Sequence, residues 1–225
     1  MSTIDASELL RPGLLEGVSI LLAGVASAGR ADGAGTLGDG VRRACSGLGA
    51  RVCELSVDVS GGHEETAIEQ AAQQAVERAL ADSRTVELLV VDCASVFARA
   101  GGGAGAGGGN AEGPREALRA CLDSAWNVTR AVVDGAFLPS ARGGRIVYLA
   151  PCADAGEHAD AACAGLENLA RTLSIEWARH GITPVTIAPG ASTMGEVAAL
   201  VAYLASPAGA YFSGCLLDLR GVAGA

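Results

Sequence analysis

Cysteine thiols and a histidine imidazole are the side chains of this sequence best suited to covalent or metal chemistry. Cys121, Cys152, Cys163 and His158 lie in the second half of the chain, and thiolates and neutral imidazoles serve both as zinc ligands and as nucleophiles or bases. The seven cysteines form no C-x-x-C pair and lack the spacing of a disulfide framework. We therefore expect reduced thiols that mostly fill core positions, and no metal site.

The elements that position these residues are predicted from hydrophobic patterning. Short, nearly continuous apolar runs predict parallel strands covered on both faces, at 17–23, 50–59, 86–91, 145–150, 183–188 and 215–219. Apolar residues at helical spacing, or an Ala/Gln/Glu-rich composition, predict helices at 66–81, 114–133 and 161–177. Strands that alternate with helices imply right-handed crossovers. The predicted fold is therefore an α/β, Rossmann-like, doubly wound parallel sheet.

The length of 225 residues suits one domain. We assign residues 17–225 to this domain and residues 1–16 to an N-terminal extension. The glycine run at 101–109 is predicted to be a flexible loop. A phosphate cradle is the alternative for this run, but the run has no Lys followed by Ser or Thr and does not open directly into a helix.

Charge and hydropathy exclude several classes of partner. The formal net charge is −9 at neutral pH, which repels phosphate backbones and acidic lipid, so neither nucleic acid nor a membrane surface is expected as a partner. The first residues carry acids and a Pro-Gly break, and no apolar stretch reaches spanning length. These observations predict a cytoplasmic protein.

Three segments of the second half resemble the short-chain dehydrogenases/reductases. GLENLARTLSIEWARHGITPVTIAPG, at 165–190, is similar to the helix, strand and Pro-Gly turn that follow the active site of this family. WNVTRAVVDGAFLPSARGGRIVYLAP, at 126–151, resembles the preceding helix and strand, and EVAALVAYLASPAGAYFSGCLLDLRG, at 196–221, resembles the terminal helix and strand. The first half matches less closely but in the family's order. The resemblance implies a single-domain Rossmann-like fold, although a fold does not by itself establish chemistry.

The resemblance also implies where the catalytic residues should stand. Family enzymes transfer a hydride between NAD(P) and a carbonyl or alcohol; Tyr acts as general acid/base, Lys lowers its pKa, and Ser and Asn complete a tetrad. Counted along the matching motifs, the Tyr, Lys, Ser and Asn positions hold Ala159, Cys163, Ala150 and Cys121. The titratable side chains nearby lack the family's spacing; they are Asp154, Glu157, His158 and Asp160. We therefore expect no catalytic residue in this chain, and a protein that is not an enzyme.

The cofactor site implied by the resemblance is also altered. The family's TGxxxGxG loop holds a pyrophosphate against a helix N-terminus. Gly24 begins such a motif here, but its next match, at Gly38, follows an insertion. Asp58 and Ala94 are the remaining traces of the family's adenine-side and NNAG motifs, and no acid is expected at the end of the second strand. We expect a disrupted glycine-rich loop and no cofactor in this chain.

The family's mobile substrate lid is missing from the pattern. Pro189-Gly190 is followed within six residues by Glu196, which belongs to the terminal helix. Because a lid excludes water and shapes the substrate pocket, its loss predicts a site that does not close.

The parts that resemble the family most closely are those it uses for assembly. The two long helices and the terminal strand offer small and apolar residues for packing. The interface candidates are Leu118, Leu122, Ala125, Leu166, Leu169, Leu173, Trp177 and Leu217. The alternative is that these residues only cover the chain's own sheet.

Together these observations predict a non-catalytic subunit of a heteromeric short-chain dehydrogenase. The expected partner is an active paralogue, in a dimer of heterodimers, that binds NAD or NADP and acts on a hydroxyacyl or ketoacyl thioester. The precedent implied by the resemblance is hydroxybenzylsuccinyl-CoA dehydrogenase, in which a degenerate relative supports an active subunit.

The sequence leaves two other functions open. The chain could be a homo-oligomeric sensor that holds a nucleotide or an acyl ligand without turning it over. It could instead be an enzyme with atypical chemistry at Cys163, Cys121 or His158, because the tetrad positions that these residues occupy or flank cluster in the family's fold.

Overall fold

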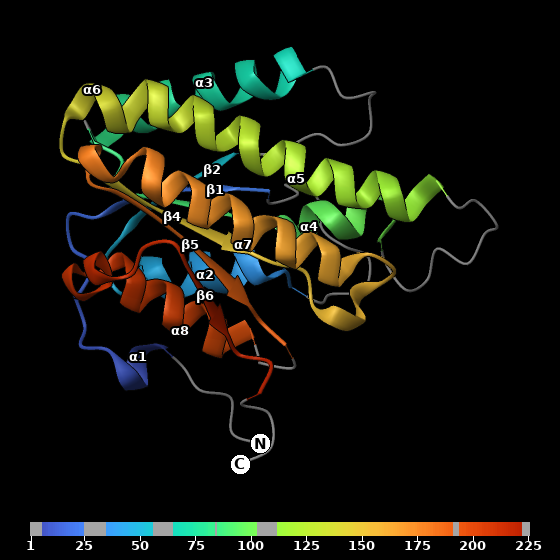
Figure 1. Ribbon diagram of the computed structural model, residues 1–225. Coiled ribbons are helices and arrows are strands. Elements are labelled where there is room, and N and C mark those ends of the chain that lie inside the picture. Colours follow the sequence, from blue (N-terminus) through green and yellow to red (C-terminus); the bar gives the residue numbers. More distant parts are fainter. Residues whose placement is uncertain are drawn as a thin grey trace.

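One parallel sheet organises the molecule (Figure 1). The computed structural model describes residues 6–24, 35–55, 65–83, 85–102, 112–190 and 194–221. Within these residues the strands run in the order β2-β1-β3-β4-β5-β6, and every neighbouring pair is parallel. The strands are β1 (Ser19–Ala23), β2 (Arg51–Leu55), β3 (Leu88–Val91), β4 (Gly144–Leu149), β5 (Ile182–Ala188) and β6 (Cys215–Asp218). The predicted α/β fold is confirmed, and each strand begins within two residues of its predicted start.

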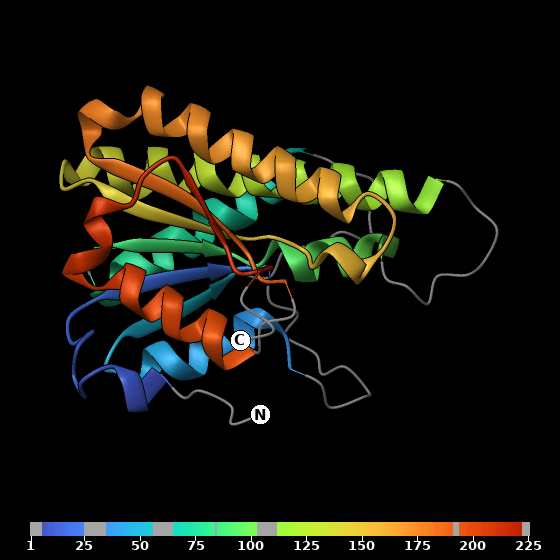
Figure 2. The ribbon, with the colours of Figure 1, turned by 60° about the horizontal axis from the view of Figure 1, so that its bottom comes forward.

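Helices cover both faces of the sheet (Figures 1 and 2). One face carries α3 (Glu65–Ser83), α4 (Cys93–Phe97), α5 (Glu112–Val132) and α7 (Ala159–Glu176). The other face carries α1 (Ala6–Leu9), α2 (Leu37–Gly47) and α8 (Met194–Ala205). Short helical turns complete the chain: η1 (Ala98–Gly102), η2 (Val133–Phe137), α6 (Leu138–Ser140), η3 (Ala153–Ala155), η4 (Ala178–His180) and η5 (Pro207–Tyr211). The helices predicted at 66–81, 114–133 and 161–177 are α3, α5 and α7, whereas α2 was not predicted.

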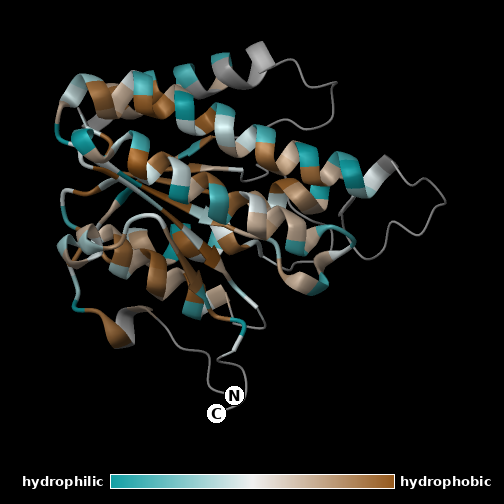
Figure 3. Ribbon diagram, in the orientation of Figure 1, coloured by the Kyte–Doolittle hydropathy of each residue, from teal (hydrophilic) through white to brown (hydrophobic). Residues whose placement is uncertain are grey.

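Each strand serves two hydrophobic cores, which explains why the strand sequences are apolar without alternation. Successive side chains of a strand point to opposite faces. In β1, Leu21 and Ala23 join the core beneath α5 and α7, while Ile20 and Leu22 join the core beneath α2 and α8. Figure 3 shows apolar residues along the strands and polar residues on the outer sides of the helices.

The segment before β1 packs against the domain. Ala6 and Leu15 are buried in the core beneath α2 and α8, and the Leu15 N–H donates to the Leu48 carbonyl at 3.0 Å. Residues 6–16, which were assigned to an extension, therefore contribute side chains to that core. None of the described helices combines the length and the apolarity that a bilayer crossing requires. The glycine run lies largely outside the described residues, since only Gly101 and Gly102 belong to η1.

A buried hydroxyl pair joins β4 to α5. Tyr148 and Thr129 are both fully buried, and their hydroxyl oxygens lie 2.9 Å apart. Burial raises the pKa of Tyr148, so its phenol stays protonated. We expect Tyr148→Phe to lower the free energy of unfolding by about 1–2 kcal/mol, because the Thr129 hydroxyl then loses its buried partner. Denaturant unfolding measures this effect.

The double variant Tyr148→Phe/Thr129→Val is the control for this pair. Because it removes both hydroxyls together, its cost should be smaller than the sum of the two single costs. Strictly additive costs would show that the two hydroxyls do not interact.

Candidate functional site

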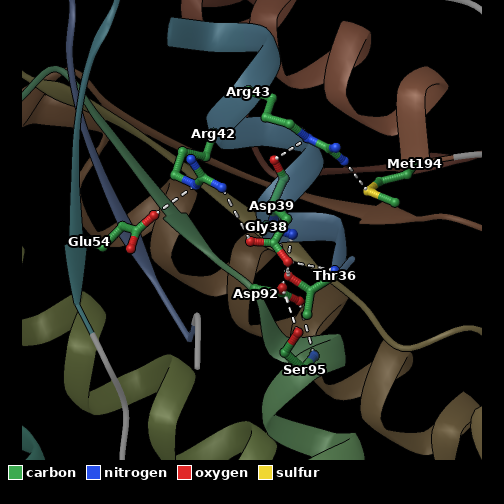
Figure 4. Close-up of polar contacts among 9 residues, drawn as sticks. All are labelled: Thr36, Gly38, Asp39, Arg42, Arg43, Glu54, Asp92, Ser95 and Met194. Carbon is green, nitrogen blue, oxygen red and sulfur yellow. Dashed lines mark hydrogen bonds and ion pairs between the residues drawn. The ribbon is translucent and has the colours of Figure 1, made fainter. Parts of the chain in front are cut away.

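The candidate site lies where the strand order reverses. The chain moves from β1 to β2 on one side and then returns to β3 on the other side of β1. In open α/β sheets, ligands bind beyond the carboxyl ends of the strands at such a switch point. Gly24 follows β1 and Asp92 follows β3, and the Asp92 N–H donates to the Ala23 carbonyl at 2.7 Å. The first turn of α2 lies beside them (Figure 4).

Asp92 is the centre of a polar network at this point. Its carboxylate accepts from the Gly38 N–H at 2.9 Å, from the Ser95 N–H at 3.0 Å and from the Ser95 hydroxyl at 2.7 Å. The side chain is fully buried, and burial raises its pKa although the hydrogen bonds and the nearby Arg99 act in the opposite direction. Asp92 therefore caps α4 and ties it to the first turn of α2.

A capping box closes the N-terminus of α2. The Thr36 N–H donates to Asp39 Oδ2 at 2.8 Å, and the Asp39 N–H donates to Thr36 Oγ1 at 3.1 Å. The hydrogen bond from the Thr36 backbone is the main cause of the lowered pKa of Asp39, so this carboxylate is ionised at neutral pH. The T-x-x-D spacing of Thr36 and Asp39 is the sequence signal that could have revealed α2.

An ion pair continues this network to β2. Arg42 on α2 lies 2.9 Å from Glu54 Oε1 and 3.7 Å from Asp39 Oδ1 (Figure 4). Glu54 is the penultimate residue of β2, so the expectation that this strand end lacks an acid is wrong. The expectation failed because the predicted strand ran on to residue 59, well past Glu54, whereas β2 ends at Leu55. In dinucleotide-binding folds a carboxylate near this place bonds the ribose.

The residues retained from the cofactor motifs fall into this region. Gly24 and Gly38 are buried, and the Gly24 carbonyl accepts from Arg99 Nη1 at 2.6 Å. Ala94 is half-buried in α4, next to the Asp92 network. Asp58 lies outside the described residues, as do residues 25–34, which include the inserted part of the glycine-rich loop.

The four tetrad positions belong to the core beneath α5 and α7. Cys121 and Ala150 are fully buried, while Ala159 and Cys163 form the first turn of α7 and are nearly so. Burial raises the pKa of the Cys163 thiol, and Arg220 acts in the opposite direction. Cys93 and Cys121 are in side-chain contact; burial first, and then the Cys121 thiol, raise the pKa of Cys93. The Cys163 and Cys93 thiols are therefore protonated, and weak nucleophiles, at neutral pH.

Charged side chains reach the same edge from β6 and from the loop before α7. Arg220 donates to both Asp218 oxygens at 2.9 and 2.8 Å, and its Nη1 lies 3.7 Å from Asp160 Oδ1 on α7. His158 immediately precedes Ala159, adopts a left-handed backbone (φ 69°), and lies 3.6 Å from Glu157 Oε1. An imidazole can exchange a proton at physiological pH, and a guanidinium can stabilise a developing oxyanion. Neither His158 nor Arg220 occupies a tetrad position.

No group of three or more His, Cys, Asp or Glu side chains gathers as a metal site within the described ranges.

Only residues 191–193 separate Gly190 from α8, so the segment that holds the lid in the family is very short here.

Three of the eight interface candidates are inside the chain's own core. Ala125, Leu166 and Leu173 are at most 5% exposed, so they contact the sheet and its neighbours rather than a partner. They were predicted as interface residues because they belong to the apolar stripe of their helix. In this fold that stripe packs against the sheet. Five candidates are partly exposed and stay predictions: Leu118, Leu122, Leu169, Trp177 and Leu217.

Comparison with known proteins adds the family context. No protein-family model matches the chain, and no curated protein matches it. Solved structures do. A citronellol catabolism dehydrogenase of Pseudomonas aeruginosa has a TM-score of 0.70 and 26% identity, with 93% of this chain and 96% of that chain covered. A short-chain dehydrogenase of Mycobacterium smegmatis has a TM-score of 0.72, 22% identity and coverage of 97% and 95%.

A third similar structure is a hydroxysteroid dehydrogenase of Escherichia coli, with a TM-score of 0.68, 17% identity and coverage of 93% and 98%. The fold is that of the short-chain dehydrogenases/reductases.

The neighbours also correct the expectation that this chain is not an enzyme. That expectation is wrong, because the solved structures that it resembles are dehydrogenases and the likeness points to a short-chain oxidoreductase. The expectation was drawn from the altered tetrad positions, the interrupted glycine-rich loop, the adenine side and the missing lid. Groups from other elements also reach the site edge, where Arg220 lies near Asp160 and Cys163.

Proposed function

We propose that this protein is one subunit of an NAD(P)-dependent short-chain oxidoreductase, formed with a homologous chain in a dimer of heterodimers. The assembly is the unit that transfers hydride, and a hydroxyacyl or ketoacyl thioester is its proposed substrate class. The dehydrogenase fold of the neighbours supports the reaction class. The thioester follows from the resemblance to heteromeric members of the family.

The outer surface of α5 and α7 is the observation that carries this proposal. The two helices lie side by side on one face of the sheet (Figures 1 and 2). Their packing is close, since a Cβ atom on Gly165 would lie 2.8 Å from Leu122 Cδ2. On the solvent side Trp126 is 39% exposed and Ile175 is 78% exposed. Large apolar side chains that are exposed on adjacent helices are typical of an interface rather than of a solvated surface.

The assembly is tested by co-expression with a homologous short-chain dehydrogenase from the same genome, followed by size-exclusion chromatography and an NAD(P)H assay. We expect a stable complex that is more active than either chain alone. The double variant Trp126→Glu/Ile175→Glu should weaken the complex at least thirtyfold, because it places two charges in a desolvated contact. Activity should fall in parallel at low protein concentration.

Tyr211→Glu is the matched control, because Tyr211 is 91% exposed and lies in η5, outside α5 and α7. This variant should leave the α5/α7 contact intact. The proposal is wrong if no complex forms and the co-expressed homologous dehydrogenase reaches full activity alone.

A further inference from the structure

The first turn of α2 is the place where a dinucleotide would be held in this fold. A helix N-terminus offers unpaired N–H groups and a partial positive charge, and both attract the pyrophosphate of NAD or NADP. Whether this chain can hold such a group depends on what those N–H groups already bind, and on the charge around them.

Three N–H groups of this turn donate to acceptors from the chain itself. The Gly38 N–H donates to Asp92, which reaches across from the end of β3. The Asp39 N–H donates to the Thr36 hydroxyl, and the Thr36 N–H donates to Asp39. Figure 4 shows Asp92 and Asp39 beside Thr36 and Gly38 at this turn. A pyrophosphate would have to displace at least one of these acceptors.

The charge of the turn is unfavourable for a second anion. Asp39 is an ionised carboxylate, as its lowered pKa shows, and Asp92 is an acid fully enclosed between α2 and α4. The nearby cations have partners within the chain. Arg42 is shared between Glu54 and Asp39, and Arg99 donates to the Gly24 carbonyl. Arg43 donates to the Asp39 carbonyl and to the Met194 sulfur. The Asp39 carboxylate would repel a second anion placed at this turn.

Met194 adds a steric obstacle. It is the first residue of α8, and a Cβ atom on Gly40 would lie 2.5 Å from Met194 Cγ. The guanidinium of Arg43 donates to the Met194 sulfur at 3.3 Å. The start of α8 therefore lies directly against the first turn of α2, on the side where the sheet's carboxyl edge opens.

We infer that the α2 N-terminus of this chain is closed to a dinucleotide pyrophosphate by its own carboxylates, Asp92 and Asp39. This inference goes beyond the proposed function, because it concerns the cofactor affinity of this chain alone. NAD(P) in the proposed assembly is then bound at the homologous chain. The residues that the fold would use for the cofactor do not fit it here. Side-chain carboxylates of the chain occupy the place that the cofactor pyrophosphate would take.

Calorimetric titration of the purified chain with NADH, NADPH and inorganic pyrophosphate tests this inference. We expect dissociation constants in the millimolar range for the wild type. Asp39→Asn should tighten pyrophosphate binding about tenfold, because it removes one negative charge while retaining an oxygen that can cap the helix. Asp92→Asn should act in the same direction, and the double variant should exceed both.

Asp134→Asn is the control for net charge, since Asp134 is exposed in η2 at the far end of α5. It should leave binding unchanged. Thermal melting checks that each variant folds; if Asp92→Asn does not fold, the Asp39→Asn result decides. Micromolar NADH binding by the wild type, or no tightening in Asp39→Asn, overturns the inference. Neither result bears on whether the α5/α7 complex forms, so the two proposals fail separately.

Discussion

Replacing Gly24 with alanine is expected to lower the free energy of unfolding by about 3 kcal/mol, from backbone strain and steric overlap together. Gly24 has φ 98°, a backbone conformation that residues with a Cβ atom rarely adopt. The added Cβ atom would also lie 2.7 Å from the Asp92 carbonyl oxygen, which is a backbone atom and cannot rotate away. Relief requires β1 and the start of α4 to separate. Guanidinium unfolding followed by circular dichroism measures the loss.

Gly47→Ala is the matched control for Gly24→Ala. Gly47 ends α2, its φ is not positive, and nothing lies within 4 Å of an added Cβ atom. Alanine should therefore stabilise the protein by about 0.5 kcal/mol through helix propensity and reduced freedom of the unfolded chain. If Gly24→Ala costs less than about 1 kcal/mol, the close approach of β1 to Asp92 described above is incorrect.

Truncating Phe137 to alanine is expected to cost about 3–5 kcal/mol, the usual range for a fully buried aromatic ring. Phe137 ends η2 and is 1% exposed. Its ring lies against Gly144 at the start of β4, so closely that a Cβ atom there would be 2.5 Å from ring atoms. The ring therefore fills the space between the end of α5 and the sheet, and neighbouring backbone cannot collapse into the cavity. Chemical denaturation gives the difference directly.

Phe212→Ala removes the same side chain from a half-buried position and is the control for Phe137→Ala. Its ring lies edge-on to that of Tyr203, at a centroid distance of 6.0 Å. Its cost should be about 1 kcal/mol. Gly144→Ala offers a second check, because it should be costly in the wild type and tolerated once Phe137 is alanine. Equal costs in both backgrounds would contradict the ring's position.

The fold could be predicted from the sequence because both faces of the sheet are covered. Burial on both faces makes runs such as Ile20 to Ala23 apolar at every position, and such runs are visible without any partner. The long helices α5 and α7 were visible for the same reason, since each must bury a stripe of residues. Helix α2 was not predicted because three glycines interrupt its apolar stripe, at Gly38, Gly40 and Gly47.

The candidate site was less predictable because its contacts join residues far apart in the chain. The sequence around Asp92 predicts only the end of a strand. Nothing in that sequence indicates that the Asp92 carboxylate accepts a hydrogen bond from the Gly38 N–H. Glu54 was overlooked because the apolar pattern extends past the point where β2 ends. The approach of Arg220 to Asp160 depends on β6 lying beside β5, which is a property of the topology and not of local sequence.

The choice between interface and core could not be made from helix patterns. Leu166 and Leu169 are three residues apart on α7, yet the first is fully buried and the second is partly exposed. Helical phase separates them by only a part of a turn. The large side chains that do face solvent, Trp126 and Ile175, lie off the apolar stripe and were not among the predicted interface residues.

The position of β1 between β2 and β3 also has a consequence for how the chain reaches its fold. Ile20 of β1 lies opposite Leu88 of β3, so one side of the first strand cannot be covered until much of the chain has been made. Pairing between such distant segments is slow, because the intervening loop must lose entropy before any contact forms. During synthesis an apolar strand is thus exposed for as long as its neighbour takes to appear, and this interval is when the chain is most prone to aggregate.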